Sequence, residues 1–144
     1  ASDVYKRQVY ANELNLKFTN ENFSPNEISI LILLSNNPSI NTSSQLCTIL
    51  GVSKGLISRS IDALVEKGYI ICAKDDADKR IQRLSFSPQA APVIQKLNEE
   101  LTKMNNEVLQ GISKEELQQV ETTMTKILTR FKERNETQHE KNNV

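Results

Sequence analysis

Small and cationic side chains follow one another closely in the middle of the sequence. This group consists of Ser53, Lys54, Gly55, Ser58 and Arg59. An ammonium or guanidinium group binds phosphate, an arginine fork also pairs with the edge of a guanine base, and a serine hydroxyl bonds to either. These residue types therefore favour recognition of nucleic acid over covalent catalysis.

A second charged group comprises Asp78, Lys79 and Arg80. Residues Tyr69–Ala73 before it and Arg83–Ser87 after it are rich in β-branched, aromatic and alternating apolar side chains, which predicts two strands joined by a charged turn. An arginine at the tip of such a hairpin can enter a narrow, electronegative minor groove. Alternatively, Arg80 forms a salt bridge with Asp78, and both roles hold together if the acid orients the guanidinium.

Residues for other kinds of chemistry are scarce. The sole histidine is His139, Cys47 and Cys72 lack a metal-binding spacing, and the four glycines form no phosphate-binding loop. We therefore expect no catalytic residue, no metal site and no cofactor. The two cysteines fit a reducing cytoplasm, where we expect them as small buried side chains. No apolar run approaches the ~20 residues of a membrane helix, so we expect a soluble protein.

Apolar spacing and capping residues predict the helices that position these groups. Four helices precede the hairpin, over residues 4–16, 25–36, 42–50 and 54–67. The second begins at a capping box of Ser24, Pro25 and Glu27 and is apolar almost all round, which predicts a central place in the core. The fourth begins at Ser53 and ends before Gly68. Its buried stripe is expected to comprise Ile57, Ile61, Leu64 and Val65.

A short helix, a turn at Gly51–Ser53, a second helix and a charged hairpin, in this order, make a winged helix-turn-helix. The second helix of this motif fits the ~12 Å major groove, which brings Ser58 and Arg59 to base edges and Lys54 to phosphate. Residues 51–87 hold 7 basic and 5 acidic side chains, although the whole chain has no net charge. The alternative is a winged-helix module that binds a partner protein through the same helix face, which would favour apolar residues there.

Two long helices are predicted after the hairpin. The first begins at Ser87 and Pro88 and reaches Gly111, and the second begins at a capping box of Ser113 and Glu116. Their apolar seams are longer than a small winged lobe can cover, so a homodimer is the economical arrangement. Two recognition helices related by a two-fold axis then predict a palindromic operator in double-stranded DNA.

The expected fold class is mainly α with a small β-hairpin wing. Within a single domain of 144 residues, the winged helix-turn-helix lobe spans 24–87, long dimerisation helices span 1–23 and 88–135, and a flexible tail spans 136–144. The lobe is expected to carry the nucleic-acid contacts, and the flanking helices are expected to carry the dimer contacts.

Three runs of this sequence resemble the multiple antibiotic resistance regulator (MarR) family of bacterial winged-helix repressors. They are Gln45–Lys54, Ile57–Ile70 and Asp78–Arg80, and the resemblance extends from about Ser24 through Ser87. It implies a dimer held by its first and last helices, a recognition helix at Ser53–Lys67, and an Arg80 that Asp78 holds in the minor groove. It also implies that a small aromatic or amphipathic ligand relieves repression by filling the space between the dimer helices and the DNA-binding lobe.

Two positions depart from the family pattern. Phe86–Ala90 stands where members usually carry a leucine-threonine-x-x-glycine signature, and Cys47 stands where they often carry alanine. The Ser-Pro cap within the first of these segments still predicts a helix start. Redox-sensing relatives keep a reactive cysteine in the first helix, and the first helix predicted here contains none, so the resemblance does not imply oxidant sensing.

Overall fold

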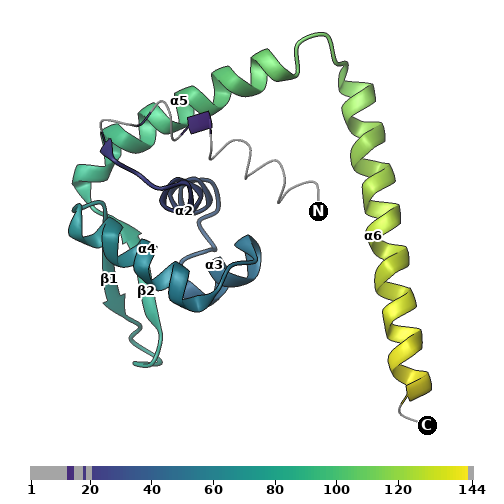
Figure 1. Ribbon diagram of the computed structural model, residues 1–144, viewed down its shortest axis with the longest axis horizontal. Coiled ribbons are helices and arrows are strands. Elements are labelled where there is room, and N and C mark those ends of the chain that lie inside the picture. Colours follow the sequence, from purple (N-terminus) through teal and green to yellow (C-terminus); the bar gives the residue numbers. More distant parts are fainter. Residues whose placement is uncertain (1–12, 15–17, 19–20, 143–144) are drawn as a thin grey trace. The chain divides into compact units, whose positions relative to one another are not determined.

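The computed structural model describes Glu13, Leu14, Phe18 and residues 21–142 (Figure 1). It divides into two compact units, Ala1–Asn105 and Asn106–Val144, and the winged lobe lies entirely within the first. The helix predicted over residues 4–16 falls outside the described residues, apart from Glu13 and Leu14, which are helical.

Helices dominate the first unit, and one antiparallel hairpin completes it. The elements are α2 (Pro25–Asn36), α3 (Ser43–Leu50), α4 (Lys54–Glu66), β1 (Ile70–Lys74), β2 (Gln82–Phe86), a 3-10 turn (Pro88–Ala90) and α5 (Ala91–Val108), of which residues 106–108 belong to the second unit. This order confirms the predicted fold class, which is mainly α with a small hairpin wing. In Figure 1, α2 lies among α3, α4 and α5, and the hairpin extends from the end of α4.

The hairpin reaches one residue further toward its tip than predicted. The amide of Tyr69 donates to the carbonyl of Leu64 at 2.9 Å, closing the end of α4 around Gly68, so β1 begins at Ile70. Gly68 has a φ of 81°, the left-handed conformation expected of a helix-ending glycine. At the other end Lys74 pairs with Gln82. The charged turn therefore comprises residues 75–81.

The capping box predicted for α2 is only half present. Ser24 accepts a bond from the amide of Glu27 at 3.2 Å, as a helix N-cap does. The carboxylate of Glu27, however, forms an ion pair with Lys67, which lies just after α4. Because Glu27 is buried, a tertiary partner for its charge takes the place of the local backbone bond. This pair ties the end of α4 to the start of α2.

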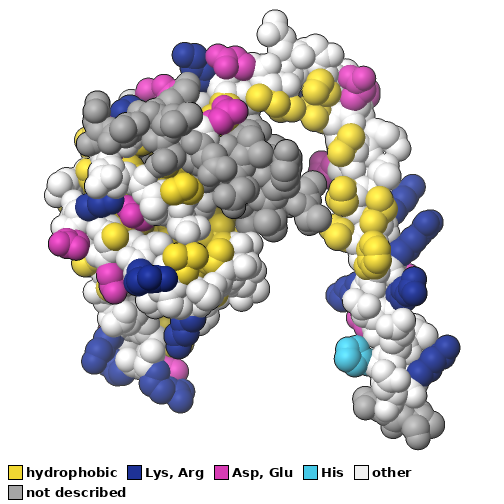
Figure 2. All heavy atoms as spheres, in the orientation of Figure 1, with side chains coloured by type: hydrophobic (Ala, Val, Ile, Leu, Met, Phe, Trp, Pro, Cys, Tyr) yellow, Lys and Arg dark blue, Asp and Glu magenta, His cyan; other side chains and the backbone are white. Residues whose placement is uncertain are grey.

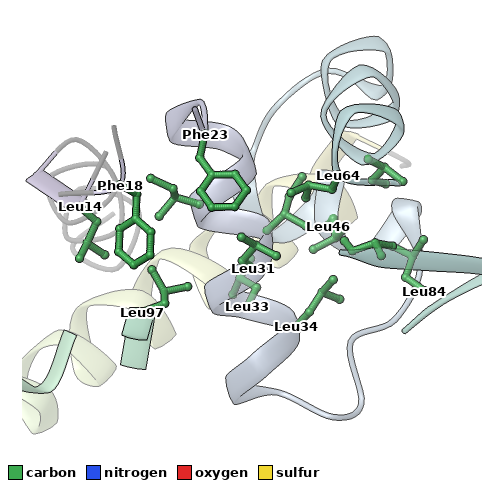
Figure 3. Packing of buried hydrophobic residues seen from close by; sticks show 14 of the residues in the cluster. Leu14, Phe18, Phe23, Leu31, Leu33, Leu34, Leu46, Leu64, Leu84 and Leu97 are labelled. Atoms are coloured by element: carbon green, nitrogen blue, oxygen red, sulfur yellow. The ribbon is translucent and has the colours of Figure 1, made fainter. Parts of the chain in front are cut away.

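One apolar core joins all the elements of the lobe (Figure 3). The side chain of α2 residue Leu31 lies between those of Leu46, Leu64 and Leu97 from neighbouring helices, and each of these four is at most 1% exposed. The buried face of α2 comprises Ile28, Ile30, Leu31, Leu33 and Leu34, which confirms its predicted central place. Each such side chain contributes about 1.5–3 kcal/mol by leaving water.

The second unit contains one long helix, α6 (Lys114–Asn142). It begins at the predicted capping box, where the amide of Ser113 donates to Glu116 at 2.7 Å and the amide of Glu116 donates to the Ser113 hydroxyl at 3.1 Å. The helix continues to Asn142, into the segment from residue 136 that was expected to form a flexible tail; its last turns contain neither glycine nor proline and are rich in helix-forming Glu, Gln and Lys. Among the described residues, no helix combines the length and apolar character needed to cross a membrane.

Three side chains of the lobe are more exposed than predicted. Val65 is 41% exposed, and Cys72 is exposed while Cys47 is half-buried. Only Ile70 of β1 is buried, and both faces of the strand are exposed beyond it, so Cys72 lies past the edge of the core although it shares the face of Ile70. Partial burial of the sulfur and the nearby charge of Asp62 nevertheless raise the pKa of the Cys72 thiol, which keeps it protonated and poorly reactive.

Candidate nucleic-acid interface

Helix α4 presents one face to the core and the opposite face to solvent. The hydroxyl of Ser53 accepts the amide of Leu56 at 3.2 Å and so fixes the first turn. Three residues of the predicted stripe are buried, namely Ile57, Ile61 and Leu64. The predicted site residues of the helix are all exposed on the other side, namely Lys54, Gly55, Ser58 and Arg59.

The turn before α4 is set by two caps. Thr42 and Gln45 form a reciprocal capping box at the start of α3, and Gly51 ends that helix with a φ of 65°. The amide of Gly51 donates to the carbonyl of Cys47 at 2.9 Å. A left-handed residue at this point lets α4 begin after only a short turn, which produces the helix-turn-helix geometry.

Arg59 is available for a ligand. It lies on the exposed face beside Ser58, and within the described residues it forms no ion pair, so the alternative pairing with Asp62 or Glu66 is not present. Gly55, one turn earlier, has helical geometry, and a Cβ added there would meet nothing within 4 Å. The fold therefore does not require glycine at position 55, and its absent side chain leaves room for close approach from outside.

At the hairpin tip, Arg80 and Asp78 form a two-point ion pair. The Nε and Nη2 atoms of Arg80 donate to Oδ1 and Oδ2 of Asp78, each at 3.0 Å, and the amide of Arg80 donates to Oδ1 at the same distance. The bond from Arg80 lowers the pKa of the Asp78 carboxyl, and the carboxylate raises the pKa of the guanidinium. The side chain of Arg80 is 91% exposed, so the acid orients it without covering it.

Lys79 is held more loosely than its neighbour. Its Nζ lies 3.7 Å from Asp76 Oδ1, and both side chains are largely in solvent. An exposed pair at that distance contributes little to stability. Lys79 is therefore a weakly paired charge beside an oriented one, and Figure 2 shows Lys and Arg side chains gathered over this end of the hairpin.

Sequence reasoning missed a second ion pair at the base of the turn. Arg83 donates through Nε to Asp75 Oδ1 at 2.9 Å and through Nη1 to Asn41 Oδ1 at 2.9 Å. The bond from Arg83 is the main cause of the lowered pKa of the Asp75 carboxyl. The opposite charges on either side of the predicted turn were a signal for the first contact. No local pattern indicated Asn41, which lies 42 residues away in sequence.

The arrangement of α3, the turn, α4 and the hairpin defines the class of the protein as a winged helix-turn-helix. Its exposed helix face carries small and cationic residues, and its wing carries an oriented arginine. The sequence model of the MarR family matches residues 21–81, which cover α2, α3, α4, β1 and the hairpin tip. Over these residues the chain is similar to the MarR family, and the solved structures that share its fold include transcriptional regulators.

Three solved structures illustrate the similarity. The transcriptional regulator BldR from Sulfolobus solfataricus is 25% identical with a TM-score of 0.67, over 90% of this chain and 89% of that one. A MarR family transcriptional regulator from Listeria monocytogenes, complexed with a 26mer DNA, is 22% identical with a TM-score of 0.68, over 85% and 81%. The heme sensor PefR from Streptococcus agalactiae, in complex with heme, is 21% identical with a TM-score of 0.53, over 83% and 80%.

Proposed function

We propose that this chain is a homodimeric transcription regulator that binds a palindromic DNA operator through α4 and the hairpin. The observation that carries the proposal is the exposed Arg59, which forms no ion pair with any residue that the structure describes; it lies on a helix whose opposite face is buried, next to a hairpin that holds Arg80 at its tip. Nearly all of the exposed face of α4 is small, polar or charged, which favours nucleic acid over an apolar partner protein.

The dimensions and chemistry of α4 suit the major groove. A helix of about 10–12 Å diameter fits a groove about 12 Å wide. In this position Ser58 and Arg59 contact base edges, and Lys54 contacts a phosphate close to the N-terminus of the helix. The hairpin then places Arg80 in the adjacent minor groove, with Lys79 near the backbone. The Listeria protein, which shares the fold and is complexed with a 26mer DNA, supports DNA binding by this chain.

The apolar side of α6 supports a dimer. Five of its large apolar side chains are between 38% and 64% exposed, namely Leu117, Val120, Ile127, Leu128 and Phe131. A stripe of this kind on a helix is covered by another apolar surface in stable proteins. We assign that role to a second copy of the chain, with segments 1–23 and 88–135 forming the dimer contacts. The two-fold axis then spaces the half-sites by about 34–36 Å or a multiple of that distance.

Regulation by a small molecule completes the proposal. We infer that the protein is a cytoplasmic repressor and that an aromatic or amphipathic ligand alters its affinity for DNA. The support is the family resemblance together with PefR, which is described as a heme sensor. Only the class of regulation is carried over to this chain, because an identity of 21% indicates a shared fold and does not identify the ligand.

Selection from a randomised duplex library, followed by fluorescence-anisotropy titration of the enriched sequence, tests DNA binding. We expect a palindrome to be enriched, and we expect Arg59→Ala to weaken its binding by about 1–3 kcal/mol. The control is Lys141→Ala, which removes an exposed cation from α6 outside the proposed dimer segments and leaves affinity unchanged. Failure to enrich any sequence would favour the protein-interaction module instead.

A further inference from the structure

We propose that Arg83 is a positioning residue that connects the helix-turn-helix to the wing arginine through a continuous chain of hydrogen bonds. This chain, here called the wing relay, consists of Asn41, Arg83, Asp75, Asp78 and Arg80. The inference rests on the proposed DNA-binding function, because it assigns a residue that sets the position of Arg80 without touching DNA itself. Its physical basis is the geometry of three successive links.

The first link anchors the relay to α3. Asn41 precedes the α3 N-cap, and its amide donates to Gln45 Oε1 at 2.9 Å, so it is fixed to the first turn of that helix. Its carbonyl accepts the amide of Leu84 at 2.8 Å, and its side-chain oxygen accepts Nη1 of Arg83 at 2.9 Å. Both bonds join the loop before α3 to neighbouring residues of β2, so the base of the hairpin is tied to the helix-turn-helix.

The second link runs through both oxygens of Asp75. Oδ1 accepts Nε of Arg83 at 2.9 Å, while Oδ2 accepts the backbone amides of Ala77 and Asp78 at 3.1 and 3.0 Å. One carboxylate therefore fixes the turn backbone and is itself fixed by Arg83. Its side chain is 20% exposed, against 42% for Arg83, so the pair lies partly inside the lobe surface.

The third link is between Asp78 and Arg80 at the tip, where two bonds of 3.0 Å orient the guanidinium and a third of 3.0 Å holds the backbone amide of Arg80. The relay matters because the outer half of the hairpin lacks an apolar anchor. Cys72, Ala73 and Lys74 are all exposed, and a two-stranded hairpin alone is marginally stable in water. Polar links therefore determine where the tip stands relative to α4.

A double-mutant cycle on the selected operator tests the coupling of Arg83 to Arg80. We expect Arg83→Gln to weaken binding about five- to tenfold in the native background and less than about twofold in an Arg80→Ala background. A direct contact between Arg83 and phosphate would instead give equal losses in both backgrounds and reduce the salt dependence by about one charge. That result would overturn the proposal.

Two neighbouring acids provide a charge-matched comparison. Asp75→Asn and Asp76→Asn each remove one negative charge beside the DNA, which on electrostatic grounds alone strengthens binding. Asp75 belongs to the relay, whereas Asp76 lies outside it and is paired with the loosely held Lys79. We expect Asp75→Asn to weaken operator binding about threefold or more and Asp76→Asn to leave it equal or tighter. Equal effects of the two substitutions would contradict the relay.

Amide hydrogen exchange in the free protein separates this proposal from the proposed function. The amides of Ala77, Asp78 and Arg80 donate to relay carboxylates, so we expect Arg83→Gln to speed their exchange about tenfold while α2 and α4 amides stay unchanged. This outcome is expected whether or not the chain binds DNA. Unchanged exchange at the tip would overturn the relay even if operator binding fell, and faster exchange in α2 and α4 would show general destabilisation in its place.

Discussion

Helix α4 and the hairpin present their cations by opposite means. The helix is held by apolar packing, with Ile57, Ile61 and Leu64 buried beneath its exposed face. The hairpin has apolar anchors only at its base, where Ile70 and Leu84 are buried, and its tip is held by ion pairs and hydrogen bonds. Apolar burial responds weakly to salt and pH, whereas exposed ion pairs respond to both.

Because they are held differently, α4 and the hairpin tip suit contacts that tolerate different amounts of variation in position. A rigid helix keeps its side chains in one register for reading bases, where an error of an ångström breaks a hydrogen bond. A minor-groove arginine responds to the width and potential of the groove and tolerates more variation in position. Apolar anchoring for the helix and polar anchoring for the tip suit these two demands. If α4 has an apolar anchor and the tip a polar one, substitutions in the two regions should affect stability and binding differently.

The largest effect is expected from the anchor of α4. Leu64 is 0% exposed, so Leu64→Ala removes buried methyl groups and leaves a cavity, at a cost of about 2–5 kcal/mol in the free energy of unfolding. Urea unfolding followed by circular dichroism measures the change. Asp75→Asn, made at the anchor of the tip, is expected to change that free energy by less than about 1 kcal/mol. Similar losses in the free energy of unfolding from both substitutions would contradict the contrast between apolar and polar anchoring.

The contrast between apolar and polar anchoring also explains which features could be predicted from the sequence. Apolar spacing and a serine cap predicted α4 to within one residue, since periodic burial leaves a direct mark on the sequence. Val65 was misplaced because it follows the period but falls at the edge of the stripe, in the last turn. The pairing of Arg80 with Asp78 was foreseen because the two residues are neighbours in sequence. The bond from Arg83 to Asn41 was not, since only the folded chain brings the two together.

The next effect in size concerns the wing arginine. Arg80→Ala is expected to weaken operator binding by about 1–3 kcal/mol per half-site, with the loss concentrated on operators flanked by A·T steps. Asp78→Ala is expected to reproduce part of that loss, although it removes a negative charge close to DNA. Anisotropy titrations at fixed salt on operators with A·T and G·C flanks measure both.

The control for this pair is Lys79→Ala, which removes a neighbouring cation that is not oriented. Its loss should be similar on both flanks and should reduce the salt dependence by about one charge. The informative result is the direction of the Asp78→Ala effect. Equal or tighter binding by that variant would mean that the acid does not orient Arg80.

A smaller effect is expected from Gly55→Ala, which should stabilise the fold and weaken operator binding. The fold leaves space for a Cβ there, so Gly55→Ala should raise the free energy of unfolding by about 0.5–1 kcal/mol through helix propensity. If the bare backbone of α4 meets DNA closely, the same methyl group should weaken operator binding. Thermal unfolding and anisotropy on one sample measure the two quantities. Gly111→Ala is a poor control because its φ of 79° adds strain, so the native protein serves as the reference.

The smallest effect is a local response to acid that should appear at the tip and not in α4. Bonds from Arg83 and Arg80 lower the pKa values of Asp75 and Asp78 below the ordinary 3.8, so the folded tip binds fewer protons than the unfolded chain near that pH. The stabilisation of the tip is therefore fully present above pH 3.8 and is lost as the pH falls through the lowered pKa values.

Carboxyl chemical shifts measured by NMR should titrate below pH 3.8 at both residues, and exchange of the Ala77 and Arg80 amides should speed up over the same range. Because α4 is anchored by apolar contacts, its amides should stay protected where the tip has already opened. Loss of protection in both regions at one pH would show that the tip and the helix unfold together, and the contrast between apolar and polar anchoring would not hold.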